Sequence, residues 1–366
     1  MIKDKHKQMK HSKIVIGGMR FSSAENAREV IHKAIDCGFN YIDVSPAYCR
    51  NDGIGSEEWV GAALQDPAYR DKVMVSTKCA PGNGGMQLGD FRKEGGFGVR
   101  SADELQQVFD QSLSRMNLPR VDWYHLWTTH TMEQFNEAMK PGGWYDGVMA
   151  NKDKWSHLGI TTHADSDTAI AFLESGKFEA ITIPLNVINT TRLRVVDYCN
   201  ANNIRVIAMN PFAGGFLAQH EQLKELALRY LMRLDVHPLI GFSAVEEVDY
   251  AKMIEDTMDD YPLSVDEILA EVNTLIDTSE KRCTACGYCT PCPQDIVVGA
   301  ALSYYNLYKY MGMEEAKQAF QNKQWEAGLV LKNCVQCGIC EKRCPNGLPV
   351  LEIIRDANRI LYAEAV

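Results

Sequence analysis

The chain has 366 residues, of which 46% are hydrophobic and 23% charged, a composition typical of a globular protein and not of a disordered one. Its formal charge of −10 argues against general binding to nucleic acid or to an anionic membrane, so we expect a small-molecule substrate. No apolar run forms a signal peptide or is long enough to span a bilayer, which predicts a cytoplasmic protein.

Cysteine usage is the most informative feature of the composition. The chain holds twelve cysteines, and eight of them fall into two groups after residue 280. The other four are scattered: Cys37, Cys49, Cys79 and Cys199. In a chain without a secretory signal, grouped cysteines indicate metal binding before they indicate disulfides.

The first forty residues introduce a pattern that most of the chain repeats. The apolar run at 13–19 predicts a strand, and residues 23–38 predict a helix because apolar residues recur there at helical spacing. We expect a capping box of Ser22 and Glu25 to begin this helix and Gly38 to end it.

The alternation of helices with short buried strands continues to about residue 243. Eight strands are predicted, at residues 13–19, 39–44, 72–78, 121–127, 156–161, 180–186, 205–211 and 237–243. This alternation favours an α/β fold with a parallel sheet covered on both faces, and the number eight favours a closed (β/α)8 TIM barrel over an open doubly wound sheet. Catalytic residues are then expected at the carboxyl ends of the strands.

The pattern changes after residue 262, where helical segments alone remain around the two cysteine groups. We therefore predict a barrel domain at residues 1–262 and a small α-helical, ferredoxin-like domain at residues 263–366.

The two cysteine groups have the spacing of iron–sulfur ligands. The second group matches the run C-x₂-C-x₂-C-x₃-C-P of bacterial-type ferredoxins. It consists of Cys334, Cys337, Cys340 and Cys344. The first group departs from the run in one spacing, since two residues rather than three precede its last cysteine. It consists of Cys283, Cys286, Cys289 and Cys292.

This spacing predicts two [4Fe–4S] clusters. In two-cluster ferredoxins the fourth cysteine of each run ligates the other cluster. One cluster is accordingly assigned to Cys283, Cys286, Cys289 and Cys344, and the other to Cys334, Cys337, Cys340 and Cys292. The alternative is zinc, but tetrahedral zinc sites take cysteines in pairs rather than in evenly spaced triplets.

Three residues after the second and third strands resemble the active site of the aldo-keto reductases. Asp43 and Tyr48 are separated by four residues, and Lys78 ends the next strand. The stretches "GFNYIDVSPAYCRNDGIGSEEWVGAAL", "IPLNVIN", "VIAMNPFAGGFL" and "LIGFSAVEE" resemble the same family, across roughly residues 13–260. With its cysteine groups, the chain is similar to the iron–sulfur-containing branch of that family.

The three residues suit carbonyl reduction. Hydride addition to a carbonyl leaves an alkoxide that needs a proton, and tyrosine, with a pKa near 10, is a poor donor unless its phenolate is stabilised. We expect Lys78 to lower the pKa of Tyr48, and Asp43 to keep Lys78 charged and in place.

The fourth catalytic residue implied by the resemblance is a histidine closing the fourth strand, and Trp127 occupies that position. An indole N–H can donate a hydrogen bond to a carbonyl oxygen but cannot shuttle a proton. His130, in the loop beyond the strand, is our candidate substitute. His163 is a further candidate, and His125 is expected one layer deeper, as a core residue.

The resemblance also implies a nicotinamide nucleotide, NADP(H) or NAD(H), near Asn186, Gly214, Gly215, Gly241 and Ser243. Glu247 and Ala251 occupy the positions that usually stabilise the nucleotide. With Glu246 and Asp249 nearby, a 2′-phosphate is expected to be repelled, which favours NADH or no nucleotide. The long glycine-rich segment 79–99 is expected to form a substrate lid or a contact with the cluster domain.

These observations support three hypotheses about function. The leading one is an oxidoreductase in which the barrel acts on a small carbonyl or alcohol and the clusters carry electrons to or from a redox partner protein. The second is a redox-neutral lyase or isomerase that uses Tyr48 and Lys78 as acid and base. The third is an electron-transfer or redox-sensing protein.

Overall fold

The computed structural model of the protein describes residues 11–49, 54–81, 98–277, 282–289, 291–323 and 328–363. Contacts divide the chain into two compact units. Among the described residues, the second unit consists of residues 212–227 and those from 264 onward, and the first unit holds the rest. The domain ranges 1–262 and 263–366 remain a prediction from the sequence. By contacts, residues 212–227 belong to the C-terminal unit.

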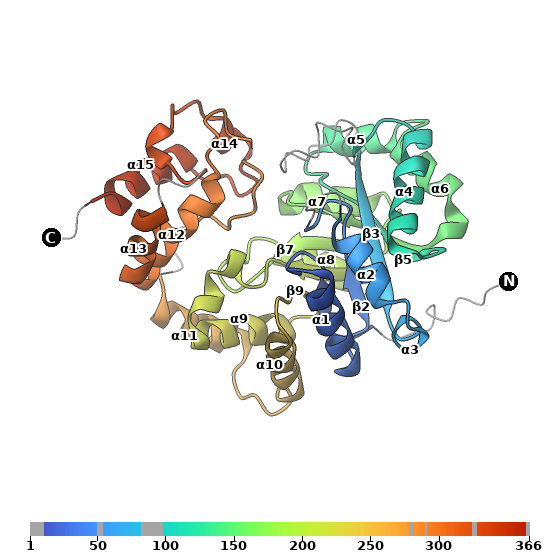
Figure 1. Cartoon of the computed structure of the whole chain (residues 1–366), viewed down its shortest axis with the longest axis horizontal. Helices are drawn as coiled ribbons and strands as arrows, with labels where there is room; N and C mark the ends of the chain where they lie inside the picture. Colours follow the sequence, from blue (N-terminus) through green and yellow to red (C-terminus); the bar gives the residue numbers. More distant parts are fainter. Residues whose placement is uncertain are drawn as a thin grey trace. The chain divides into compact units, whose positions relative to one another are not determined.

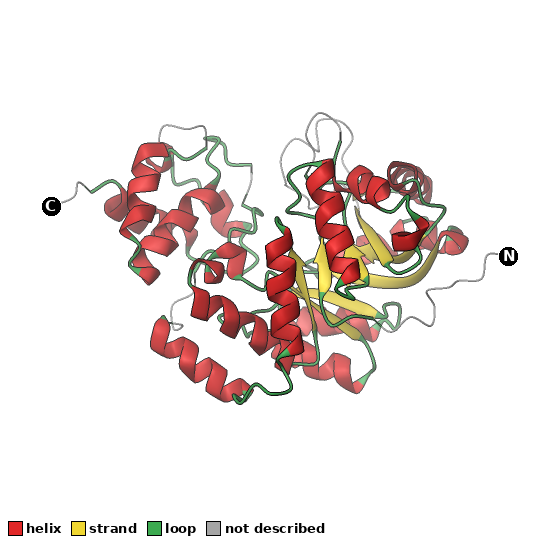
Figure 2. Cartoon of the chain, turned by 60° about the horizontal axis from the view of Figure 1, so that its bottom comes forward, coloured by secondary structure: helices red, strands yellow, loops and turns green. Residues whose placement is uncertain are grey.

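The first unit is a closed barrel of eight parallel strands, as predicted, because β9 pairs with β1 and every neighbouring pair is parallel. The strands are β1 Val15–Gly17, β2 Tyr41–Asp43, β3 Met74–Pro81, β5 Val121–Leu126, β6 Trp155–Thr161, β7 Ala180–Pro184, β8 Arg205–Met209 and β9 His237–Gly241. A two-residue strand, β4 Gly98–Val99, extends the pairing beside the carboxyl end of β3. Helices surround the strands, as Figure 2 shows.

Within the described ranges, ten helices alternate with or follow the strands of the barrel. They are α1 Ala24–Asp36, α2 Ser56–Ala63, α3 Pro67–Arg70, α4 Ala102–Met116, α5 Met132–Met139, α6 Trp144–Ala150, α7 Ser166–Glu174, α8 Leu193–Ala201, α9 Glu221–Arg233 and α10 Val245–Asp256. Short 3-10 turns lie at Lys152–Lys154 (η2), Ala213–Gly215 (η3) and Leu217–Gln219 (η4).

The start of α1 differs from the prediction by one residue. Ser23, not Ser22, is the N-cap, and its side chain accepts a hydrogen bond from the backbone N–H of Asn26. Ser22 instead donates its backbone N–H to the side chain of Asn26. The prediction of a capping box formed by Ser22 and Glu25 is therefore wrong. Ser23 and Asn26, each one position later, form the hydrogen bonds at the start of the helix. Gly38 follows the helix with a φ of +89°, as a helix stop requires.

Side chains that point into the barrel form layers, because alternate residues of each strand face inward. A lower layer contains Val15, Tyr41, Met74, Trp123, Ala180 and Ile207. Two residues further along their strands lie Asp43, Ser76 and His125. The inward layers rise toward the carboxyl ends of the strands, where polar side chains replace apolar ones.

The second unit is helical and has its own core. Its helices are α11 Val265–Leu275, α12 Val298–Met311, α13 Glu314–Lys323, α14 Ile339–Lys342 and α15 Val350–Leu361, with a 3-10 turn at Leu331–Asn333 (η5). Leu302, Phe320 and Ile354 lie in the centre of the core, and cysteines of both groups pack against it. The two cysteine loops are thus supported by helices that bury apolar residues beneath them.

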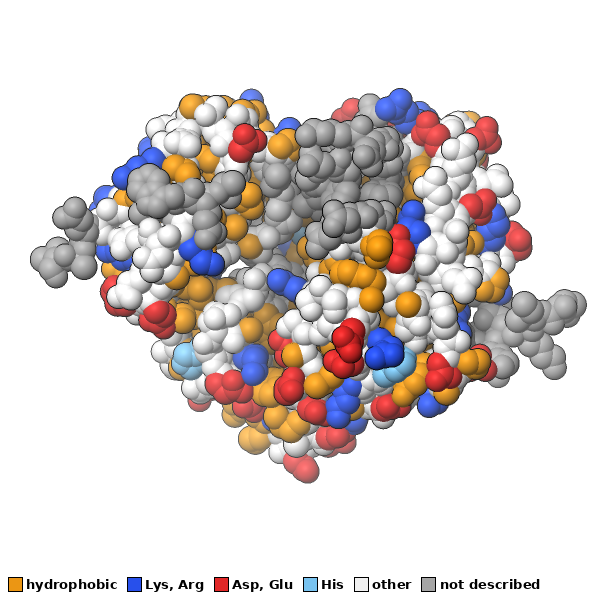
Figure 3. Space-filling view, viewed as in Figure 1, with side chains coloured by type: hydrophobic (Ala, Val, Ile, Leu, Met, Phe, Trp, Pro, Cys, Tyr) orange, Lys and Arg blue, Asp and Glu red, His pale blue; other side chains and the backbone are white. Residues whose placement is uncertain are grey.

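No helix in the described part of the chain is long and apolar enough to cross a membrane. On the face shown in Figure 3, acidic and basic side chains are interspersed. The predicted lid segment 79–99 lies mostly outside the described residues.

Candidate active site and cysteine module

The candidate site begins with a buried ion pair inside the barrel. The Nζ atom of Lys78, on β3, lies 2.5 Å from Oδ2 of Asp43, on the neighbouring strand β2. Lys78 is 2% exposed and Asp43 is 3% exposed. Ser76, two residues before Lys78 on the same face of β3, donates its hydroxyl to Oδ1 of Asp43 at 2.7 Å. Both carboxylate oxygens therefore have donors, which a buried charge requires.

The phenol of Tyr48 lies at the outer side of this pair. Lys78 Nζ donates to Tyr48 Oη at 3.3 Å, and the tyrosine is half-buried. The ring of Trp127 meets the ring of Tyr48 edge-on, with centroids 5.9 Å apart, and its centroid lies 5.8 Å from Lys78 Nζ. Asp43, Tyr48, Lys78 and Trp127 are thus brought together, as their positions at the strand ends predicted.

The protonation of the site differs from the prediction for Tyr48. Burial raises the pKa of Tyr48 above its ordinary value, and the opposing effect of Lys78 does not overcome it. Burial alone would lower the pKa of Lys78, but Asp43 and then Tyr48 outweigh it and leave that pKa raised. At neutral pH the site therefore holds a protonated phenol beside an ammonium.

His125 lies beneath these residues, one layer deeper than Trp127. It is fully buried, its Nε2 is 3.2 Å from the hydroxyl of Tyr41, and its ring faces Gly159 on β6 so closely that a Cβ there would lie 2.4 Å from it. Burial lowers the pKa of His125 to about 4. The side chain is a neutral core residue that only glycine at position 159 accommodates.

His130 and His163 meet in the loops that follow β5 and β6. The backbone N–H of His163 donates to Nδ1 of His130 at 3.0 Å, and the two rings are perpendicular with centroids 5.5 Å apart. In its neutral form His130 therefore carries its proton on Nε2. Burial lowers the pKa of His130 to about 4 and places the pKa of His163 well below its ordinary value.

Arg192 holds this loop pair in place, a role that no sequence pattern indicated. Its guanidinium donates to the backbone carbonyls of His163 and Ala164 at 2.6 and 2.8 Å. The side chain is 4% exposed and contributes to the lowered pKa of both histidines, after burial. Ser76 was also missed, although the alternation in "VSTK" places it on the same strand face as Lys78.

The predicted nucleotide positions of the first unit are engaged in local contacts. The side chain of Asn186, after β7, donates to the backbone carbonyl of Asn210 and accepts from the backbone of Ile188. At the end of β9, the carboxylate of Glu247 accepts the backbone N–H of Ser243 at 2.7 Å and its hydroxyl at 3.1 Å. Glu247 thus occupies the donors at the start of α10 that an anion would otherwise use.

Gly214 and Gly215 belong to the second unit, and Gly214 contacts its first cysteine run. Gly214 has a φ of +74°, and a Cβ there would lie 2.5 Å from the carbonyl oxygen of Thr284. In the same unit the guanidinium of Arg282 lies 5.4 Å from the ring centre of Phe216 and 4.1 Å from that of Tyr310. The loop that the resemblance assigns to a pyrophosphate is packed against the neighbours of Cys283.

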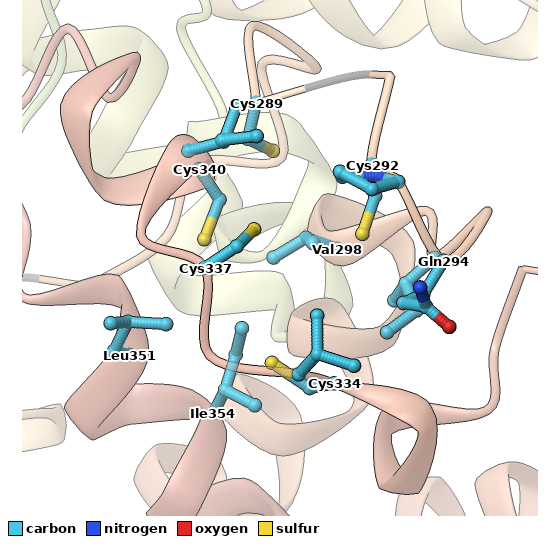
Figure 4. Close-up of a pocket in the computed structure, with 13 residues that line it drawn as sticks. Cys289, Cys292, Gln294, Val298, Cys334, Cys337, Cys340, Leu351 and Ile354 are labelled. Atoms are coloured by element: carbon cyan, nitrogen blue, oxygen red, sulfur yellow. The ribbon is translucent and has the colours of Figure 1, made fainter.

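The cysteines line two adjoining cavities. One cavity contains Cys289, Cys292, Cys334, Cys337 and Cys340, and Figure 4 shows these side chains arranged around it. The other contains Cys283, Cys286, Cys289, Cys340 and Cys344. Each cavity holds the four cysteines that the spacing assigned to one cluster, and Cys289 and Cys340 line both.

The two cysteine runs share one backbone conformation. Ala285 and Gln336, each directly before the second cysteine of a run, have φ values of 51° and 54°. Gly287 and Gly338, each directly after that cysteine, have φ values of 80° and 75°. Alternating left-handed residues curl a loop so that its thiols face one centre, which is the arrangement that a cubane cluster needs.

The chain belongs to the aldo/keto reductase family. The family's sequence profile matches residues 13–226, and the profile of a 4Fe-4S dicluster domain matches residues 282–349. The protein is therefore an oxidoreductase of this family that carries a ferredoxin-type iron–sulfur domain, in which two cysteine groups imply two [4Fe–4S] clusters.

Similar proteins agree with this assignment. A 6-dehydroglucose reductase from Novosphingobium aromaticivorans is 24% identical over 242 residues, which span 61% of this chain and 73% of that protein. The aldo-keto reductase YhdN from Bacillus subtilis is 30% identical over 114 residues, which span 30% of this chain and 31% of that protein.

Solved structures share the barrel fold. Aldo-keto reductase AKR11C1 from Bacillus halodurans, in its holo form, has a TM-score of 0.58 and 17% identity, over 72% of this chain and 93% of its own. An aldo-keto reductase from Klebsiella pneumoniae in complex with NADPH has a TM-score of 0.55 and 17% identity, over 72% of this chain and 91% of its own.

The lowered pKa of His125 predicts how stability depends on pH. The unfolded chain binds this proton near pH 6.5, whereas the folded protein binds it only near pH 4, so protonation favours unfolding as the pH falls. This histidine should remove about 2 kcal/mol of stability between pH 7 and pH 5. Denaturant unfolding of wild type and His125→Gln at both pH values tests this, and equal losses in the two proteins would contradict it.

Proposed function

We propose that the barrel interconverts a small organic carbonyl compound and the corresponding alcohol, and that the C-terminal module carries the electrons of this reaction. Oxidation of an alcohol to a carbonyl releases two electrons and two protons, and reduction takes up the same number. The electron pair leaves or enters the substrate carbon as a hydride, so the proposal requires a bound carrier of the flavin class that takes up the hydride and passes its electrons on singly. Each [4Fe–4S] cluster, when bound, would then accept or release one electron, so two clusters match the two electrons of one turnover.

Tyr48 is the proposed acid and base. Its phenol is half-buried at the mouth of the site and protonated at neutral pH, so it can donate to an alkoxide that forms beside it. The phenolate left behind faces the ammonium of Lys78, 3.3 Å away, which limits the cost of that negative charge. Asp43 keeps Lys78 in place, and Trp127 forms an apolar wall that excludes water.

The observation that carries the proposed coupling is the packing of the loop that contains Gly214. This loop directly follows β8, which forms part of the barrel wall, and it packs on Thr284 between two cysteines of the first run. A change in the conformation of the first cysteine run would therefore displace the Gly214 loop, which is continuous in the chain with β8. The redox-neutral alternative gives no reason for this contact.

The coupling is tested by Gly214→Ala. A methyl group there meets the Thr284 carbonyl and should displace the loop, which slows the bleaching of cluster absorbance by an alcohol substrate about tenfold while iron and sulfide stay bound. The measurement is anaerobic stopped-flow absorbance with sugar-derived aldehydes and alcohols, chosen because one relative is a 6-dehydroglucose reductase. Tyr48→Phe should abolish the bleaching.

Gly215→Ala is the matched control for this variant. Gly215 also has a positive φ, of +98°, but a Cβ there meets nothing within 4 Å. The control should retain most of the wild-type rate. Equal rates in all three proteins would contradict the coupling, and clusters that never change redox state with any substrate would overturn the proposed function.

We also propose that each cluster takes ligands from both runs, Cys344 completing the first and Cys292 the second. The two cavities support this assignment, since Cys344 shares one with the first run and Cys292 shares the other with the second. The double variant Cys283→Ser/Cys344→Ser should then keep one intact cluster, with about four irons per chain.

The double variant Cys334→Ser/Cys344→Ser should lose both clusters, because it removes one ligand from each. Iron and sulfide analysis with electron paramagnetic resonance distinguishes the two. The opposite result, with two damaged clusters in the first variant and one in the second, would show that each run binds its own cluster.

The nucleotide site fits NADPH poorly, and we propose that any nicotinamide bound lacks the 2′-phosphate. Glu247 already accepts both donors of Ser243 and puts a carboxylate at a position that the resemblance assigns to stabilising the nucleotide. Fluorescence titration should show weaker binding of NADPH than of NADH, and Glu247→Gln should improve NADPH binding about fivefold. Glu133→Gln, at an exposed position in the first turn of α5, is the control. Stronger binding of NADPH to the wild type would contradict this proposal.

A further inference from the structure

The cavity formed mainly by the second cysteine run is lined by the exposed cysteine Cys337. Cys337 is exposed, whereas Cys283, Cys286, Cys289 and Cys344 are half-buried. Electron transfer between proteins needs a redox centre close to the surface. The cluster assigned to Cys334, Cys337, Cys340 and Cys292 meets that need through Cys337, whose side chain reaches the surface.

Apolar side chains are exposed beside this cavity. Val335 is 60% exposed and lines the cavity, and Val297 is 46% exposed and lies between Ile296 and Val298, which both line it. The other large hydrophobic side chains that are this exposed among the described residues belong to the first unit. Exposed apolar residues gathered at one place indicate a contact surface.

Basic residues lie within two positions of three cysteines of the second run. Lys332 lies over the ring of Tyr362, Arg343 donates to the backbone carbonyl of Pro291, and Lys342 is exposed. None of the three forms an ion pair with a carboxylate in the described part of the chain. Of the acids nearby, Glu341 accepts the backbone N–H of Leu351 and Asp295 is exposed. In the segments that line the cavity, 289–298 and 331–355, four basic residues stand against three acidic ones, a local net charge of +1 in a chain of net charge −10: Lys332, Lys342, Arg343 and Arg355 against Asp295, Glu341 and Glu352.

We propose that this surface, formed by Val297, Val335, Lys332, Lys342 and Arg343, docks a small acidic electron-carrier protein of the ferredoxin class. The inference rests on the proposed function and adds the partner and its place of contact. Each encounter moves one electron between the partner's redox centre and the cluster beneath Val335, so two encounters balance one turnover. A two-fold contact with a second copy of this chain would set the three cations against each other, which argues against self-association.

The test measures how fast a ferredoxin reduces the clusters. The reconstituted protein is mixed with a reduced [2Fe–2S] ferredoxin freed of excess reductant, and the rate of cluster bleaching is followed at several salt concentrations. The wild-type rate should fall as salt rises, because the encounter is electrostatically steered. In Val297→Glu/Lys342→Glu the rate at low salt should fall at least about tenfold.

Two controls make the result specific. Met253→Glu changes a side chain of similar exposure, 45%, in the first unit and should leave the rate unchanged. Reduced methyl viologen, a small donor that needs no docking surface, should reduce wild type and double variant equally, and their iron content and electron paramagnetic resonance spectra should agree. Ferredoxin rates that are unaffected by both salt and the double substitution would overturn the proposal.

This test separates the docking surface from the proposed function. Fast, surface-dependent reduction by ferredoxin with no redox change caused by any carbonyl or alcohol would support the docking surface and overturn the coupling to the barrel. Cluster bleaching by substrate with no dependence on the surface would do the reverse.

Discussion

The ammonium of Lys78 lies almost completely out of water, and its charge is sustained there by the carboxylate of Asp43, 2.5 Å away. An unpaired charge at this depth would either lose its proton or destabilise the barrel. The pair forms because β2 and β3 are neighbouring strands whose register sets Asp43 opposite Ser76. Lys78 lies two residues after Ser76 and therefore on the same face of β3. The position of Tyr48, and with it the acid–base chemistry of the site, depends on this pair.

The two cysteine runs use the same backbone conformation to bring their thiols together. Eight thiols must face two centres, and each run achieves this with a left-handed residue before its second cysteine and a left-handed glycine after it. Cys289 and Cys340 line both cavities, so the two centres are adjacent. The helical core beneath them, around Leu302 and Phe320, fixes the two loops relative to one another.

The loop after β8 shows how the family fold has been adapted. Relatives use a glycine-containing segment at this place for the nucleotide, according to the resemblance, whereas here Gly214 packs on the carbonyl of Thr284. The anion-binding donors at Ser243 are likewise taken by Glu247. These two contacts are the basis of the function proposed above, in which the barrel depends on the cysteine module.

The sequence by itself determined the eight strands, the helical module and the grouping of the cysteines, because periodicity and ligand spacing are local properties. The pairing of Asp43 with Lys78 was expected from the family resemblance. Tertiary structure decided the rest. The raised pKa of Tyr48 follows from burial, which the spacing of charges does not reveal. The contact of His130 with His163 and the packing of Gly214 join residues from separate loops, and their distances depend on how the whole chain folds.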